Sequence, residues 1–135
     1  MDEVILDTSI VVKWFSDEID SQAARNLLEK HKKRTIKIII PEIVALEVVN
    51  SLSLGAKFTA AYTNDALEDL YSLEIEMIPL SQKLLQKTLT LVDKYKIAAY
   101  DALFLALAQQ RQIPLITADR KHHLKEYCPL VQYLS

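Results

Sequence analysis

The sequence contains a single glycine, a single cysteine and no long apolar segment. Gly55 is the only glycine among 135 residues, which excludes both the P-loop and the glycine-rich dinucleotide-binding loop. The only cysteine, Cys128, cannot form an internal disulfide, so we expect a reducing, cytoplasmic setting. The longest unbroken apolar run is the seven residues from Ala102 to Ala108, whereas a membrane-spanning helix needs about 20. We therefore expect no contact with a membrane.

The charges of the chain nearly cancel. The chain has 16 lysines and arginines and 18 aspartates and glutamates, which gives a net charge of -2. Half of the residues are hydrophobic and 25% are charged, which is typical of one globular domain over residues 1–135. The start, Met1-Asp2-Glu3, does not resemble a secretory signal. A nucleic-acid substrate would have to be attracted by local basic patches or by a metal ion, because the global charge does not favour it.

Short apolar runs alternate with longer amphipathic segments along the chain. The runs have the length and the Ile and Val content of buried parallel strands, and they cover residues 4–6, 36–40, 75–78, 115–117 and 130–134. The segments with helical periodicity cover residues 23–28, 41–54, 66–71, 84–95 and 99–110. This alternation predicts an α/β sandwich around a mainly parallel sheet, with a ligand site at the carboxyl ends of the strands.

Four carboxylates stand in apolar surroundings. Asp7 and Asp119 follow predicted strands, whereas Glu47 and Asp101 lie in predicted apolar helices, and Asn50 extends the polar stripe of Glu47. Each aspartate has an ordinary alternative role, as a helix cap or as a first-turn acid that favours the helix dipole. Glu47 lies too deep in its helix for that, and its alternative is a buried pair with a distant lysine or arginine.

Taken together, the four carboxylates predict a metal site. Gathered at one sheet edge they would repel one another, and a multivalent cation would relieve that repulsion. Ligands that are all oxygen favour Mg²⁺ or Mn²⁺ over Zn²⁺. No convincing serine–histidine or cysteine–histidine arrangement competes: His31 lies in a basic run, and His122 and His123 have only Cys128 nearby.

Two related α/β classes fit less well. A receiver-type phosphorylation domain needs an acid at the end of its third strand, where this chain has Met77-Ile78-Pro79-Leu80. A haloacid-dehalogenase-type phosphatase needs a second aspartate two residues after the first, where this chain has Ser9.

The sequence resembles the PIN-domain family and, within it, the VapC-type toxins of type II toxin–antitoxin pairs. The resemblance covers nearly the whole chain. It is carried by four segments in order: residues 6–15 (LDTSIVVKWF), 41–50 (PEIVALEVVN), 100–108 (YDALFLALA) and 115–119 (LITAD). One departure is His122, which stands where many relatives have a bulky apolar residue three positions after the last aspartate.

The resemblance implies a three-layer α/β/α sandwich and metal-dependent hydrolysis of RNA. The acidic centre would comprise Asp7, Glu47, Asp101 and Asp119, with Asp7 and Asp101 as the most direct ligands of Mg²⁺ or Mn²⁺. The other two acids would bind a second ion or orient water. Ser9 and Thr117 would place hydroxyl groups beside the centre. The resemblance also implies a homodimer and a cognate antitoxin that docks on the segment 53–71.

Several surface features keep two interpretations. Arg120, Lys121 and Lys125 are equally expected to contact RNA phosphates or to form a solvated face. The basic run 30–34 is better explained as charge that complements a helix C-terminus. For Trp14 and Phe15 we favour packing over base stacking. Two alternative functions also stay open, a housekeeping PIN nuclease in RNA processing and a non-catalytic protein-binding PIN module, although a lone short domain favours the toxin.

Overall fold

One parallel sheet forms the centre of the molecule. The computed structural model describes residues 1–123 and 125–135, and within them five strands form one sheet in the order β3-β2-β1-β4-β5. All neighbouring strands are parallel. The strands are β1 (Asp2–Leu6), β2 (Ile36–Pro41), β3 (Glu76–Ile78), β4 (Leu115–Thr117) and β5 (Val131–Tyr133). The five predicted runs therefore all form strands, shorter by one or two residues where β3 and β5 begin or end.

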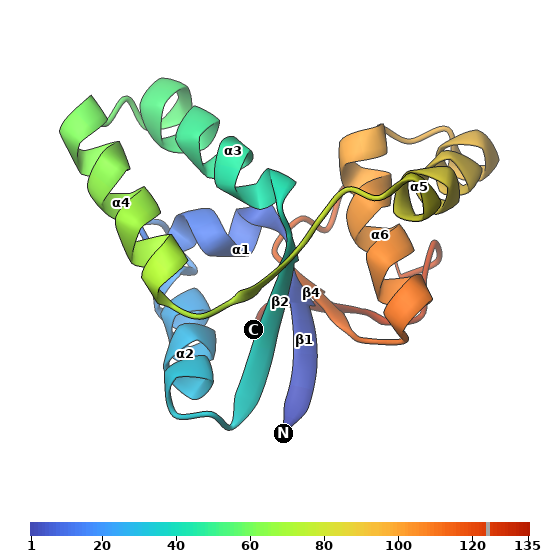
Figure 1. Cartoon of the computed structure of the whole chain (residues 1–135), viewed down its shortest axis with the longest axis horizontal. Helices are drawn as coiled ribbons and strands as arrows, with labels where there is room; N and C mark the ends of the chain where they lie inside the picture. The colour runs from blue at the N-terminus through green and yellow to red at the C-terminus, as the bar shows by residue number, and fades with distance from the viewer. Residues whose placement is uncertain (124) are drawn as a thin grey trace.

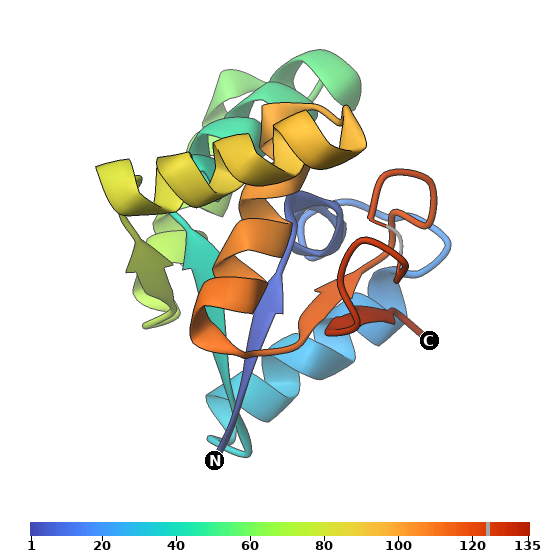
Figure 2. The same cartoon turned by 90° about the vertical axis from the view of Figure 1, so that its right-hand side faces the viewer.

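Helices cover both faces of the sheet. Figure 1 shows the strands nearly edge-on, with α1 to α4 on one side and α5 and α6 on the other. Figure 2 looks onto the second side, where the orange α6 lies against the strands and the yellow α5 crosses α6 above them. The helical elements are α1 (Thr8–Lys13), α2 (Ser21–Lys32), α3 (Ile43–Asn50), η1 (Ser51–Gly55), α4 (Ala60–Ser72), α5 (Gln82–Tyr95) and α6 (Ala99–Arg111). The predicted three-layer α/β/α fold is confirmed. In the described part of the chain, no helix combines the length and apolar character that crossing a bilayer requires.

The central elements are those whose sequences are apolar on every side. All seven residues of α6 from Ala102 to Ala108 are buried, as are Ile38 to Ile40 of β2. Trp14 is also buried, and its indole Nε1–H donates a 2.9 Å hydrogen bond to the carbonyl of Ala24, which joins α1 to α2. This contact agrees with the packing role that we favoured for the tryptophan.

The predicted helix over residues 41–54 is divided differently in the structure. Pro41 is the last residue of β2, so the strand extends one residue into the predicted helix. The α-helix α3 then ends at Asn50, and Ser51–Gly55 continue it as a π-helical turn, η1. Sequence periodicity did not distinguish the two helical geometries, because both present apolar residues at similar intervals.

The ends of several helices adopt the left-handed conformation without glycine. Gly55 does not have a positive φ. Five other residues, each at or just after the end of a helical element, have φ between 54° and 61°: Arg34, Lys57, Glu74, Lys96 and Gln112. A side chain with a Cβ atom is disfavoured there by about 1–2 kcal/mol, so these helix ends carry local strain.

Candidate active site

The four predicted carboxylates come from elements that meet where the strand order reverses. β1 lies between β2 and β4, so the chain extends the sheet first through β2 and β3 on one side of β1 and then through β4 and β5 on the other. Asp7 follows β1 directly, and Asp119 lies two residues beyond β4. Glu47 lies on α3, and Asp101 lies in the first turn of α6. In Figure 1, α3 and α6 rise on opposite sides of the carboxyl end of β1. This is the location at which parallel α/β sheets place their ligands.

The four carboxylates line one small cavity of about 120 Å³. Its lining comprises Asp7, Thr8, Ser9, Glu47, Tyr100, Asp101, Phe104, Asp119 and His123. Asn50 lies instead on the wall of a larger, adjoining groove. The structure therefore brings together acids that are 40 to 112 positions apart from Asp7 in sequence.

Asp7 is buried and held by three side chains. Its Oδ1 accepts a hydrogen bond from the Ser9 hydroxyl at 2.5 Å, and its Oδ2 accepts one from the Thr117 hydroxyl. The Nδ1 of His123 lies 2.7 Å from the same Oδ2. Although Asp7 stands at the N-cap position of α1, its side chain makes no cap hydrogen bond. Its contacts fix the carboxylate in the cavity rather than stabilise the helix end.

The ordinary structural roles considered for Asp119 and Asp101 are present in the structure, whereas the one considered for Glu47 is not found among the described residues. Asp119 does behave like a cap, because its Oδ1 accepts hydrogen bonds from the backbone N–H groups of Lys121 and His122 at 3.1 and 3.0 Å. Asp101 does lie in a first helical turn, as its alternative role required. Glu47 accepts a 2.6 Å hydrogen bond from the hydroxyl of Thr8, and in the described residues no lysine or arginine pairs with it.

His123 is a member of the site that the sequence did not reveal. Its ring is only 2% exposed and packs edge-on against Phe104. Its Nδ1 faces Asp7, and its Nε2 lies 3.2 Å from the backbone carbonyl oxygen of Asp101. Both ring nitrogens thus face oxygens that accept hydrogen bonds. The one sequence feature that pointed to His123 was its position four residues after Asp119, a predicted member of the site.

The electrostatics of the cavity reflect burial first and the proximity of several carboxylates second. Burial raises the pKa of Glu47 and of Asp101, and the charge of Asp7 adds to both effects. The pKa of Asp119 is lowered, because hydrogen bonds and charge from His122 outweigh its partial burial. Burial alone would lower the pKa of His123, but its hydrogen bond to Asp7 and the surrounding carboxylates raise it on balance.

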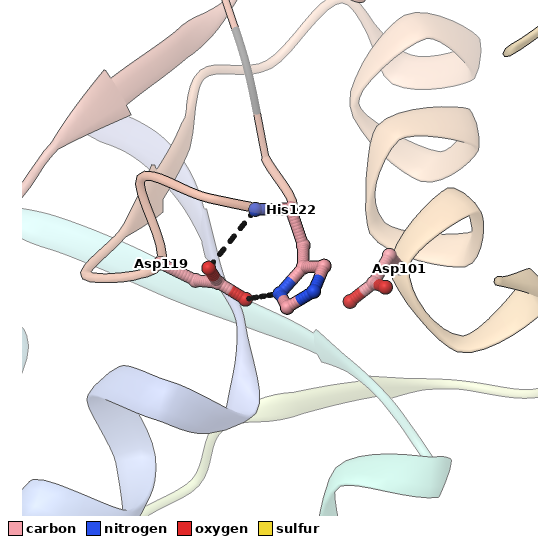
Figure 3. A group of neighbouring side chains, drawn as sticks. All are labelled: Asp101, Asp119 and His122. Atoms are coloured by element: carbon pink, nitrogen blue, oxygen red, sulfur yellow. Dashed lines mark hydrogen bonds and ion pairs between the residues drawn. The ribbon is translucent and has the colours of Figure 1, made fainter. Parts of the chain in front are cut away.

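His122 lies at the outer side of the same group. Figure 3 shows its imidazole ring between the carboxylates of Asp119 and Asp101. The ring nitrogen Nδ1 is 2.9 Å from Asp119 Oδ2. One potential ligand atom from each of these three residues lies within 4.8 Å of the others. The residue that departed from the expected pattern is therefore close to the acidic cavity.

A larger groove of about 720 Å³ adjoins the acidic cavity. Thr8, Ser9, Glu47 and Tyr100 line both, so the cavity opens into the groove. Tyr100 is 62% exposed. The lining of the groove comes mainly from α1, α3 and η1.

The three predicted phosphate contacts are exposed, and Arg120 and Lys121 follow Asp119 directly in the sequence. Arg120, Lys121 and Lys125 all lie on the surface in the segment after β4. The guanidinium of Arg120 and the ammonium of Lys125 lie over the ring of Tyr133, at 4.4 and 5.1 Å from its centre. These cation–π contacts hold two positive charges close to one another on the surface.

Comparisons with known proteins agree with this architecture. The family model described as "PIN domain" matches residues 4–127. Among solved structures, a toxin–antitoxin complex from Klebsiella pneumoniae is similar at 26% identity with a TM-score of 0.72, over 96% of this chain and 95% of that one. No curated protein sequence matches the chain.

Two more distant structures share the fold. One is VapBC2 from Rickettsia felis bound to a DNA fragment from its promoter, with 22% identity and a TM-score of 0.72 over 98% of this chain and 99% of that one. The other is VapC20 from Mycobacterium tuberculosis, described as a toxin that cleaves the sarcin–ricin loop. It has 13% identity and a TM-score of 0.70 over 85% of this chain and 87% of that one.

Proposed function

The chain belongs to the PIN domain family, and from this premise we propose that it is a metal-dependent endoribonuclease that acts as the toxin of a toxin–antitoxin pair. The observation that carries the proposal is the convergence of Asp7, Glu47, Asp101 and Asp119 on one cavity of about 120 Å³. The similar toxin–antitoxin structures support the biological role.

The donor set fits a hard divalent cation. Four carboxylates supply only oxygen ligands, which suit Mg²⁺ and Mn²⁺. Burial is the main cause of the raised pKa values of Glu47 and Asp101, and the negative charge of Asp7 raises both further; a bound cation would offset that charge. Asp7 and Asp101 are the proposed direct ligands, with Asp119 and Glu47 completing the centre. A cation bound there supplies positive charge that stabilises the phosphate during attack.

The surrounding residues position the acids. Ser9, Thr117 and His123 hold the carboxylate of Asp7, which keeps it oriented before substrate arrives. Thr8 engages Oε1 of Glu47, so Oε2 is the oxygen proposed to orient the attacking water and accept its proton. The groove beside the cavity would hold the RNA strand, with Arg120, Lys121 and Lys125 contacting its phosphates.

The proposal is tested by removing charge while keeping shape. Asp7→Asn and Asp101→Asn should lower RNA cleavage in Mg²⁺ or Mn²⁺ by about 10²-fold or more, because asparagine cannot supply the ligand charge. Asp93→Asn is the matched control, since the side chain of Asp93 is 83% exposed and, among the described residues, forms an ion pair only with Lys96. All three variants should remain folded by circular dichroism.

The outcomes separate the candidate functions. Cleavage that survives both substitutions, or that persists in chelator, contradicts the proposed centre. A wild-type protein that cleaves no RNA in either metal favours a non-catalytic binding module. Growth arrest on expression, relieved by a co-expressed antitoxin, would support the toxin role over RNA processing.

Exposed apolar side chains on η1 and α4 offer a surface for the proposed partners. Leu54, Tyr62 and Tyr71 are exposed on η1 and α4, at 73%, 43% and 63%. We propose that these side chains contribute to a homodimer interface or to antitoxin docking. Light scattering at micromolar concentration tests the dimer, and a monomeric mass without antitoxin counts against it.

A further inference from the structure

We propose that His122 is a ligand of this metal centre, so that its outer part binds through two carboxylates and one imidazole nitrogen and prefers Mn²⁺ to Mg²⁺. The inference rests on the proposed metal-dependent function and adds a ligand outside the four acids. Asp101 lies on α6, whereas Asp119 and His122 lie in the turn after β4, and the potential ligand atoms of the three residues lie within 4.8 Å of one another.

The local turn directs His122 toward the acids. Asp119 Oδ1 accepts the backbone N–H groups of Lys121 and His122, which folds the segment back over the aspartate. Asp119 Oδ2 then faces the imidazole Nδ1 at 2.9 Å. Figure 3 shows that the opposite edge of the ring points toward Asp101. The imidazole is thus held between two carboxylates by the backbone itself.

The spacing suits coordination. Ligand atoms that share one ion with bonds of about 2.1 Å lie about 3–4.3 Å apart. The potential ligand atoms lie within 4.8 Å of one another, and the side chain of His122 is 53% exposed, so small rotations can admit an ion. Imidazole nitrogen binds transition-metal ions better than Mg²⁺, which keeps oxygen ligands and water.

The adjacent histidine does not offer the same role. His123 is 2% exposed, and both of its ring nitrogens are engaged, one with Asp7 and the other with the Asp101 carbonyl. Its place is to orient Asp7. Of the two neighbouring imidazoles, only that of His122 stands at the open side of the cavity.

The test observes the metal directly. Mn²⁺ bound to the wild-type protein should show, by electron spin-echo envelope modulation, the ¹⁴N coupling of a coordinated imidazole. His122→Gln removes the imidazole nitrogen but keeps a hydrogen-bond donor for Asp119. This variant should lose the ¹⁴N coupling and bind Mn²⁺ about tenfold more weakly, while Mg²⁺ affinity changes much less. Lys83→Gln, at an exposed position on α5 away from the proposed centre, is the control and should retain both properties.

Each result decides between the proposals. A wild-type spectrum without ¹⁴N coupling, or a coupling that persists in His122→Gln, overturns the role of His122 and leaves the acidic centre standing. A wild-type protein that binds no Mn²⁺ overturns the metal centre and the proposed function together. Loss of coupling in His122→Gln with unchanged circular dichroism supports the ligand.

Discussion

Thr117→Val should destabilise the metal-free protein by about 2–4 kcal/mol. The side chain of Thr117 is fully buried, and its hydroxyl donates to Asp7 Oδ2 and accepts the backbone N–H of Asp119 at 2.9 Å. Valine has nearly the same shape but removes both hydrogen bonds. A bond to a carboxylate contributes about 1.5–3 kcal/mol and a neutral one about 0.5–1.5 kcal/mol, which sets the expected range.

Thr117→Ser is the matched control, because it keeps the hydroxyl and removes one buried methyl group. That loss costs about 1 kcal/mol. Urea unfolding in chelator measures both variants, and with a slope of about 2 kcal/mol/M the midpoint of the valine variant should lie about 1–2 M below that of wild type. If valine is no less stable than serine, the hydroxyl does not hold the two aspartates, and the account of how Asp7 is oriented is wrong.

The remaining predictions concern pH, charge and surface contacts. Because the pKa values of Glu47 and Asp101 are raised in the folded state, the free energy of unfolding should fall as the pH rises above about 4. The pKa of His123 is also raised in the folded state. Its protonated form therefore stabilises the fold below about pH 6.5, and this stabilisation is lost as the pH passes the raised folded pKa. The urea midpoint in chelator should therefore decrease as the pH is raised from 5.5 to 8, and a midpoint that does not change with pH would contradict the raised pKa values. Asp101→Asn should raise the thermal unfolding midpoint at pH 7.5 in chelator. It should also reduce the increase in that midpoint on addition of Mn²⁺, and calorimetry measures both. His31→Ala should cost about 2–4 kcal/mol in urea unfolding, because its ring bonds to the backbone of β2 at 3.1 Å and of the turn after α4 at 2.8 Å, while cleavage per folded molecule stays unchanged. Arg120→Gln, in an Asp7→Asn background, should reduce the slope of log RNA affinity against log salt by about one, and an unchanged slope would remove this residue from the RNA path.

The layout of the fold follows from local sequence signals. β2 ends at Pro41 and β4 begins right after Pro114, so proline marks the boundaries of those apolar runs. α6 is apolar on all sides and is central, as its composition predicts. The place of the carboxylates could also be predicted, because the ends of parallel strands share one sheet edge.

The histidines of the site could not be predicted in the same way. His122 and His123 lie in a turn after β4, and their direction depends on hydrogen bonds from backbone groups to Asp119 rather than on a helical or strand period. The contact from Thr8 to Glu47 spans 39 positions and depends on how α1 meets α3. Periodicity describes one element at a time, whereas these contacts arise only when elements meet.

The near absence of glycine has a practical consequence for engineering this protein. Lysine, arginine, glutamate and glutamine adopt the left-handed conformation at these helix ends. Glycine at the same positions would avoid the strain of the Cβ atom and should increase the free energy of unfolding. Lys96 and Gln112 close the two helices that pack over one face of the sheet. Neither lines the acidic cavity or its groove, so both are sites where a hardier scaffold can be built without altering the chemistry.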